Sequence, residues 1–392
     1  MKKIVLPGVV ALCIGSPPAI AADCGGSFPD FINNLAGEAL QMGYSISEVQ
    51  SFFDGIQHDP KVIRADRSQG VFQIPFVDFA RKLISQYRID HGHKNSVKYA
   101  KVFARIEREY GIPAGVLLAF WAFETDYGAF QGDFNTANAL ATLAHDCRRP
   151  ELFRPQVFAA LELYTRGDFD PDTTTGAWAG EIGMVQMLPG DILENGVDGD
   201  GDGHVQLKTS AADALMSGAD LLSHLGWQPN EPWLQEVTLP SDFDWSRTGI
   251  HTKLAISDWA RMGAKPRSGA WSKKTGTASI IIPQGRNGPA FIAYPNFDVY
   301  FEWNQSFVYV TTAAYFATRL EGAPIFDAGS PAVGLNGEEM KALQRKLQAL
   351  GHNVGKVDGI LGANTRIAVQ AEQERLGLPA DAWPTLDLLN RL

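Results

Sequence analysis

The chain has 392 residues, of which 45% are hydrophobic, 20% are charged and 10% are aromatic. This composition excludes a disordered protein, and the length corresponds to two or three domains. The 34 Lys and Arg residues and the 44 Asp and Glu residues give a net charge of −10 at pH 7. Nucleic-acid binding is disfavoured, because no excess of basic residues is available to neutralise a phosphate backbone.

Residues 1–21 have the three parts of a secretory signal peptide. Lys2 and Lys3 precede an apolar run from Ile4 to Ile14, and residues 19–21 form a small-x-small cleavage site. No later stretch has the roughly 20 continuous apolar residues of a membrane-spanning helix. We therefore expect an exported protein with no transmembrane segment.

Two cysteines remain after the signal segment, which carries Cys13. Cys24 and Cys147 form an even pair in an oxidising compartment, so we expect a disulfide between them, with two separate buried thiols as the alternative. The chain has no Cys-x-x-Cys, His-Glu-x-x-His or Gly-x-Ser-x-Gly motif and no Gly-rich phosphate loop. Zinc, serine-triad and nucleotide chemistry therefore have no support from sequence motifs.

The hydrophobic pattern is helical over most of the chain. Helices are expected between residues 28 and 86 and over residues 96–110, 113–127 and 155–164. Short β-favouring runs at residues 279–282, 291–294 and 299–302, separated by Pro and Gly, predict a small antiparallel sheet. Residues 321–336 are rich in Gly, Ala and Pro and are expected to form a linker. The predicted class is mainly α (α+β).

Residues 337–392 have the pattern of a module of three short helices. Asn336 and Glu339 have the spacing of a capping box before a helix with apolar residues at helical intervals, and Gly351 ends that helix. A second helix is expected over residues 364–376 and a third over residues 383–392. Three short helices are typical of a binding module rather than of an enzyme.

A strongly apolar helix leads to a single carboxylate at Glu124. The ten residues from Ala114 to Phe123 carry no charge, and a helix without a charged face is buried. Burial raises the pKa of a carboxyl group toward the range of a general acid. The alternatives are that Glu124 pairs with an arginine such as Arg105, or that it only begins the polar end of the helix.

Alternating aspartates later in the chain predict a calcium site. The spacing of Asp198, Asp200, Asp202 and His204 matches the first half of an EF-hand loop. In such a loop, carboxylates at alternate positions and a backbone carbonyl, here that of His204, surround the ion. The twelfth position is Thr209 instead of Glu, and the next acid is Asp213. We therefore expect a shortened site, with a plain solvated turn as the alternative.

Six motifs occur in a fixed order between residues 24 and 320. They are residues 123–128 (Phe-Glu-Thr-Asp-Tyr-Gly), 139–143, the Gly-x-x-Gly-x-x-Gln-x-x-Pro pattern at 180–189, 198–204, 226–227, and 294–298 with 303–304. Together they resemble the lytic murein transglycosylase B family, glycoside hydrolase family 103. Residues 343–378 are similar to a peptidoglycan-binding domain.

The resemblance implies a lysozyme-like catalytic region at residues 22–320, followed by the linker and a peptidoglycan-binding domain at residues 337–392. It implies a periplasmic enzyme that cleaves the β-1,4 bond between N-acetylmuramic acid (MurNAc) and N-acetylglucosamine (GlcNAc) without water, leaving 1,6-anhydroMurNAc ends. The partner is then the peptidoglycan glycan strand. No catalytic cofactor is implied, and calcium has a structural role.

The resemblance also implies roles for individual residues. Glu124 falls at the family's acid, which acts first as an acid and then as a base. Substrate-binding roles are implied for Arg148, Arg149, Gln186, Trp303, Asn304 and Tyr309. Calcium-binding roles are implied for Asp198, Asp200, Asp202, His204 and Asp213, the last with one extra residue before it.

The chain departs from the family pattern at three positions of interest. Ala177 replaces a serine, and Glu181 adds a carboxylate that could raise the pKa of Glu124, bind a peptide amine or face solvent. In the C-terminal module, Glu372 stands where an aromatic residue is common. Ala177 and Glu181 leave two alternatives open, a catalytically impaired wall-binding scaffold and a hydrolytic muramidase with Glu181 as its second carboxylate.

Overall fold

The computed structural model describes residues 24–68 and 74–392. The signal peptide predicted at residues 1–21 lies outside this described part. Helices dominate the described residues, which confirms the mainly α prediction, and none of those helices is both long and apolar enough to cross a membrane. The helices are α1 (Phe28–Gln41), α2 (Ile46–Phe53), α3 (Pro60–Arg67), α4 (Phe76–Leu83), α5 (Gln86–Lys98), α6 (Ala100–Tyr110), α7 (Ala114–Thr125), α8 (Thr136–His145), α9 (Pro150–Thr165), α10 (Pro189–Asn195), α11 (Ala211–His224), α12 (Ile256–Arg261), α13 (Pro295–Trp303), α14 (Phe307–Leu320), α15 (Gly337–Ala349), α16 (Ala363–Arg375) and α17 (Leu386–Arg391), with a 3-10 turn η2 (Trp245–Arg247).

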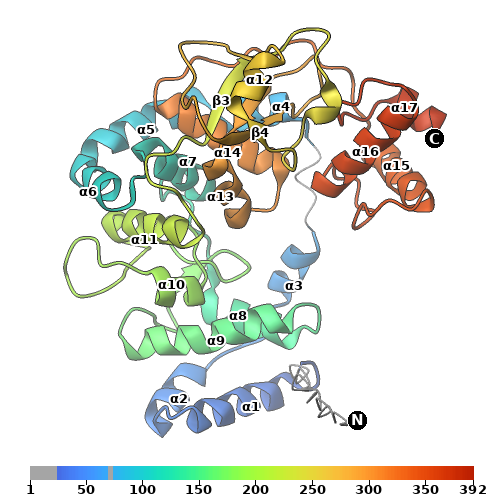
Figure 1. Cartoon of the computed structure of the whole chain (residues 1–392). Helices are drawn as coiled ribbons and strands as arrows, with labels where there is room; N and C mark the ends of the chain where they lie inside the picture. The colour runs from blue at the N-terminus through green and yellow to red at the C-terminus, as the bar shows by residue number, and fades with distance from the viewer. Residues whose placement is uncertain (1–23, 69–73) are drawn as a thin grey trace, which may run out of the picture.

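The N-terminal helices α1 and α2 lie at one end of the molecule, against α8 and α9 (Figure 1). A capping box starts α2, because the Ser45 side chain accepts from the Glu48 backbone N–H and the Glu48 side chain accepts from the Ser45 backbone N–H. Leu35 and Phe52 from these helices are fully buried in one core with Leu140 of α8. This shared core joins the start of the chain to its middle.

Helix α7 runs through a second core, packed against α5 and α14. Its residues from Val116 to Ala122 are all buried, because the helix has no charged face to present to water. The helix ends where Asp126 and Tyr127 adopt left-handed backbone conformations, with φ of 50° and 61°. Asp126 is held there by Arg88, whose Nε donates a 2.6 Å hydrogen bond to Oδ1 of Asp126.

A five-stranded antiparallel sheet lies at the opposite end of the molecule from α1 and α2 (Figure 1). Its strand order is β4-β6-β7-β3-β5, and Ile280 pairs with Ile292 across its centre. A separate two-stranded ladder joins β1 and β2. The strands are β1 (Phe134–Asn135), β2 (Thr175–Gly176), β3 (Leu234–Thr238), β4 (Leu254–Ala255), β5 (Lys265–Pro266), β6 (Thr277–Ile281) and β7 (Ala290–Ala293). The small antiparallel sheet predicted near residues 279–294 is therefore confirmed.

Two local predictions were wrong. The run at residues 299–302 is not a strand but part of α13, which begins at Pro295, a residue suited to the first turn of a helix. Burial of Phe297 and Tyr300 on the helical face outweighs the β preference of these residues. The helix predicted over residues 96–110 is divided between α5 and α6, because the backbone of Tyr99 leaves the helical region with φ −107° and ψ 25°.

Helices α15, α16 and α17 form the C-terminal module, which lies beside the sheet end of the molecule (Figure 1). The capping box predicted at Asn336 and Glu339 is present. Glu372 of α16 is buried, and its carboxylate is bonded to His352 and Arg375. An ion-paired carboxylate thus takes the place where the resemblance leads one to expect an aromatic ring.

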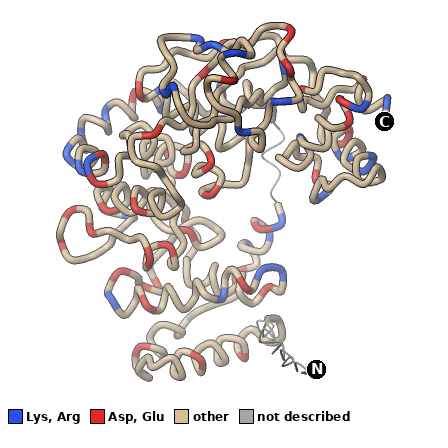
Figure 2. Tube along the Cα trace, in the orientation of Figure 1, with Lys and Arg blue, Asp and Glu red and all other residues tan. Residues whose placement is uncertain are grey.

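Charged residues of both signs are interspersed along the described chain (Figure 2). Some of the ion pairs among them are local, such as those of Arg105 with Glu109 and Lys341 with Glu338. Such exposed pairs contribute little to stability. The pairs that link distant elements are more informative, such as Arg88 with Asp126 and the pairs of Arg148 and Arg149 with Asp66.

Candidate active site

Glu124 lies half-buried in the last turn of α7. The next residue, Thr125, fixes this end of the helix, because its Oγ1 donates to the carbonyl of Met184 at 2.7 Å and accepts from the backbone N–H of Gly128. The predicted alternative, a pair between Glu124 and Arg105, does not occur. Arg105 instead bonds to Glu109.

Two ring donors converge on one oxygen of Glu124. The hydroxyl of Tyr309 donates to Oε1 at 2.5 Å, and the indole Nε1 of Trp303 donates to the same atom at 3.2 Å. Among the described residues, no donor is hydrogen-bonded to Oε2. The carboxyl group is therefore fixed through one oxygen and has the other available for proton transfer.

The surroundings of Glu124 raise the pKa of its carboxyl group. Burial is the largest cause, the hydrogen bonds from Tyr309 and Trp303 oppose it, and the nearby charge of Glu181 adds to the rise. Burial and the charge of Glu124 likewise raise the pKa of the Tyr309 phenol well above its usual value, so this hydroxyl remains a donor. A carboxyl group with a raised pKa can hold a proton near neutral pH.

Glu181 is the second carboxylate of this site. Its Oε2 is buried without a hydrogen-bond partner within the described residues. Burial raises the pKa of Glu181, while its own backbone N–H, that of Ala179 and the charge of Arg149 lower it. Glu181 is therefore coupled electrostatically both to the candidate acid and to Arg149, a predicted substrate-binding residue.

Arg148 and Arg149 both pair with Asp66 of α3. The Asp66 side chain is almost completely buried, whereas the two arginines keep 41% and 33% of their side chains exposed. Asp66 therefore holds both guanidinium groups in place while part of each still faces solvent. No sequence pattern pointed to Asp66, because these pairs span 82 and 83 positions.

Gln186 and Asn304 are oriented by backbone contacts. The Gln186 Nε2 donates to the carbonyl of Gly183 at 2.7 Å, within a turn where Gln186 itself has φ 55°. Gly183 has φ 81°, and a Cβ atom there would lie 2.4 Å from the Cβ of Leu207, so this turn requires glycine. The Asn304 Oδ1 accepts from the backbone N–H of Ser306, at the start of α14.

The acidic loop brings together three of the five predicted metal-binding residues. One carboxylate oxygen from each of Asp198, Asp200 and Asp202 lies within 4.8 Å of the others, a donor set that fits a hard cation such as calcium. The His204 ring turns away and its Nδ1 lies 2.8 Å from Asp168. The buried Asp213 carboxylate accepts from the backbone N–H groups of Gly199 and Gln206, so it braces the loop.

Comparison with known proteins decides the family. The "Transglycosylase SLT domain" family model matches residues 27–318, about three-quarters of the chain. The chain belongs to this family. The peptidoglycan binding domain model matches residues 336–392.

Three relatives of this chain are informative. SltB3 of Pseudomonas aeruginosa is 34% identical to this chain and has been solved with NAG-anhNAM-pentapeptide and with NAG-NAM-pentapeptide. In the first complex the TM-score is 0.86, and the match covers 94% of this chain and 99% of SltB3. Membrane-bound lytic murein transglycosylase B of Escherichia coli is 26% identical over 235 residues, 58% of this chain and 62% of the relative. E. coli Slt35, solved in complex with calcium, is 22% identical, with a TM-score of 0.65 over 78% of this chain and 98% of Slt35, and shares the fold.

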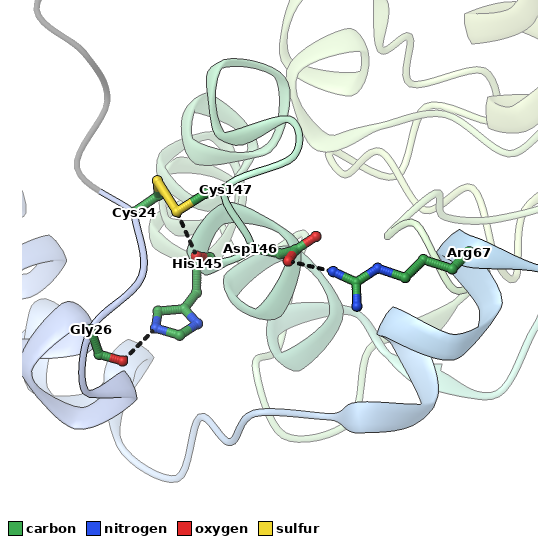
Figure 3. The surroundings of a disulfide bond; sticks show 6 residues. All are labelled: Cys24, Gly26, Arg67, His145, Asp146 and Cys147. Carbon is green, nitrogen blue, oxygen red and sulfur yellow. Dashed lines mark hydrogen bonds and ion pairs between the residues drawn. A yellow bond between two sulfur atoms is a disulfide. The ribbon is translucent and has the colours of Figure 1, made fainter. Parts of the chain in front are cut away.

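The chain contains the predicted disulfide between Cys24 and Cys147 (Figure 3). It joins the residues before α1 to the loop after α8. Beside it, His145 Nε2 lies 3.1 Å from the carbonyl oxygen of Gly26, and Arg67 donates to Asp146 at 2.9 Å. The end of α8 is thus attached both to the start of the described chain and to α3.

Proposed function

We propose that this chain is a lytic transglycosylase that cleaves the MurNAc–GlcNAc β-1,4 bond of peptidoglycan without water and leaves 1,6-anhydroMurNAc ends. The observation that carries the proposal is the half-buried carboxyl group of Glu124, whose pKa is raised and whose Oε1 is fixed by Tyr309 and Trp303. Membership of the transglycosylase family and the sugar-peptide ligands named for SltB3 support it.

Glu124 serves first as the acid. Its protonated carboxyl group gives a proton to the glycosidic oxygen, the C1–O bond breaks, and the GlcNAc leaves with a hydroxyl group. The Glu124 carboxylate then takes the proton of the substrate's own 6-hydroxyl as O6 bonds to C1. Glu124 ends protonated, as it began, so a single carboxyl group completes the cycle, in contrast to the two carboxylates of an ordinary glycosidase.

The substrate is held by side chains from several separate segments of the chain. We assign this role to Arg148, Arg149, Gln186, Trp303, Asn304 and Tyr309. The exposed parts of the two arginines can pair with carboxylates of the peptide stems. Trp303, which is half-buried, combines ring surface for a sugar with a donor to Glu124, whereas Tyr309 is buried and acts through its hydroxyl.

A structural calcium ion is assigned to the loop of Asp198, Asp200 and Asp202. The calcium complex named for Slt35 supports this assignment. We include the His204 backbone carbonyl as a ligand and give Asp213 the role of bracing the loop. The ion would neutralise three neighbouring carboxylates and so stabilise the loop between α10 and α11.

The proposed organisation is a signal peptide at residues 1–21, a catalytic region at 22–320, a linker at 321–336 and a peptidoglycan-binding domain at 337–392. The proposed location is the periplasm. The disulfide supports this location, since such bonds persist in oxidising compartments.

Product analysis on purified sacculi tests the proposal. We expect the wild-type chain to release anhydromuropeptides, and Glu124→Gln, which keeps the shape but lacks the proton donor, to lose about 100-fold or more in rate. Asp191→Asn is the matched control, because Asp191 also has a pKa raised by burial but does not contact Glu124.

Three results would contradict the proposal. Products one water heavier per cut would identify a hydrolytic muramidase. Binding of the wild-type chain to sacculi without product release would identify a scaffold. Retained activity in Glu124→Gln would show that another group is the acid.

A further inference from the structure

A cavity of about 780 Å³ lies between the catalytic region and the C-terminal module. Its walls come from residues 304–308 at the start of α14, residues 331–337 before α15, and residues 359–362 with Arg366 in the module. Its volume is within the range of about 300–1,000 Å³ that is typical of binding sites for small ligands. Neither the two ring donors to Glu124 nor the calcium loop lines this cavity.

The cavity is bounded by a well-connected interface. Gln370 of α16 donates to the carbonyls of Trp245 and Thr248 at 3.0 Å. The backbone N–H of Arg286 donates to Asp381, and Trp383 Nε1 donates to the carbonyl of Ala332 at 2.9 Å. The two walls are therefore fixed relative to each other, so the cavity is a lasting feature of the chain.

Arg366 is the cation of this cavity, and it forms no ion pair within the described residues. Its Nη2 donates to the carbonyl of Pro283 at 2.7 Å, and its Nε is buried without a hydrogen-bond partner. The charge of Asp381 acts on it, but that carboxylate is bonded to other donors, including the side chain of Gln373. The guanidinium packs over the ring of Phe307, with 4.4 Å from Cζ to the ring centroid. A partly desolvated guanidinium that has no carboxylate partner among the described residues favours a bound anion.

The remaining lining narrows the class of ligand. Apart from Arg366, the only charged residue in the described lining is Asp78 of α4, and most of the other lining is apolar or backbone. One cation and one anion with apolar surface around them match a peptide that carries both a carboxylate and an amine. A neutral sugar would leave both charges without a partner.

The cavity also lies next to the candidate active site. The segment from Trp303 to Tyr309 donates to Glu124 at both of its ends, while residues 304–308 between them line the cavity. One short segment therefore contacts the candidate acid and also forms part of the cavity wall.

We propose that this cavity binds the stem peptide of peptidoglycan, with Arg366 paired to a peptide carboxylate. The proposal rests on the proposed function for the identity of the peptide. It makes the C-terminal module and the catalytic region two halves of one peptide site.

Calorimetry on the full chain tests the proposal, with the free sugarless pentapeptide stem as the probe. Arg366→Gln should weaken binding about tenfold or more, and Arg366→Lys, which keeps the charge, should retain part of the affinity. Arg345→Gln, which removes an exposed charge from the same module, is the matched control and should bind as the wild-type chain does.

A second variant does not depend on the packing of Arg366. Gly362 lines the cavity and has an ordinary φ of −80°, and a Cβ atom at this position would have no neighbouring atom within 4 Å. Gly362→Trp should therefore place a large side chain at the cavity wall without backbone strain, and it should also weaken peptide binding about tenfold or more.

The outcomes separate this inference from the proposed function. The inference is overturned if the wild-type chain does not bind the peptide at millimolar concentration, or if Arg366→Gln and Gly362→Trp both bind it with wild-type affinity. Release of anhydromuropeptides from sacculi is measured on the same preparations. If release persists without peptide binding, only the cavity assignment fails, whereas absence of release rejects the proposed function itself.

Discussion

The hydroxyl of Tyr309 donates a 2.5 Å hydrogen bond to Oε1 of Glu124 across 185 positions of the sequence. This bond stabilises the ionised carboxylate, whereas burial of Glu124 stabilises the neutral form. The proposed cycle uses both forms, first to give a proton and then to recover one. The opposition of these two effects keeps both forms accessible.

Tyr309→Phe should slow the reaction and shift its pH profile. Loss of the donor raises the pKa of Glu124 further, so the alkaline limb of kcat/KM should move to higher pH, and the rate at neutral pH should fall about tenfold because Oε1 loses its shorter hydrogen bond. The measurement is kcat/KM against pH on peptidoglycan fragments. Tyr300→Phe is the control, since the buried Tyr300 hydroxyl has no hydrogen-bond partner among the described residues. An unchanged profile in Tyr309→Phe would contradict this role.

Glu181→Ala should shift the profile in the opposite direction. A negative charge at Glu181 disfavours ionisation of Glu124, so its removal lowers the pKa of Glu124, and the alkaline limb should move to lower pH. Burial raises the pKa of Glu181, so this side chain is ionised only at the higher pH values. The pH profiles of the wild-type chain and of Glu181→Ala should therefore differ most at those values. The products should remain anhydromuropeptides.

The matched control for this variant is Glu194→Ala. Glu194 is an exposed acid of α10 that is not among the groups acting on Glu124. Its removal changes the net charge equally and should leave the pH profile in place. A shift of equal size in both variants would show that the effect comes from overall charge and not from the position of Glu181.

Calcium at millimolar concentration should raise the melting temperature of the chain by a few degrees, because the loop brings three carboxylates close together. Magnesium should raise it less, since a loop of carboxylates suits the variable geometry of calcium better than the octahedral geometry that magnesium requires. Asp200→Asn should remove most of this rise. Glu194→Gln, which also removes one acid, should keep it. An equal calcium effect in the Asp200 variant would place the ion elsewhere.

Glu372→Gln should destabilise the C-terminal module at neutral pH. Burial alone would raise the pKa of Glu372, but the hydrogen bonds from Arg375 and His352 outweigh it and lower the pKa below 4.5. The resulting stability is present above pH 4.5 and is lost as the pH falls through the lower folded-state pKa. The variant should lose about 1–2 kcal/mol at pH 7 and should show a flatter dependence on pH in the acid range.

Urea unfolding of the full chain at several pH values measures this effect. Glu338→Gln, which removes an exposed partner of Lys341, is the control and should have no measurable effect. Equal losses in both variants, or a Glu372 variant with the wild-type pH dependence, would contradict a stabilising role for the buried network.

The sequence was most informative where one local property decided the structure. The uncharged run before Glu124 predicted a buried helix, and α7 is buried on every side, because no arrangement of that helix presents a polar face. The capping box at Asn336 was likewise local and correct. The run at residues 299–302 was misread, because the packing of Tyr300 against Phe120 depends on segments far apart in the chain.

The environment of Glu124 required more than local pattern. Trp303 and Tyr309 could be assigned to the site only through the family resemblance, since nothing within the helix indicates donors 179 and 185 positions away. Asp66, which holds Arg148 and Arg149, was not foreseen at all. Its burial results from the packing of α3 against α8, which no periodicity in the sequence reveals.

The bridge between Cys24 and Cys147 has a consequence for how the chain matures. Residues 24–392 contain these two cysteines and no others, so a single intramolecular pairing exists. Oxidation therefore cannot trap a scrambled isomer, and folding needs an electron acceptor but no isomerase to reshuffle bonds. The partners are separated by 123 positions, so this bond forms only after α1 through α8 have been synthesised.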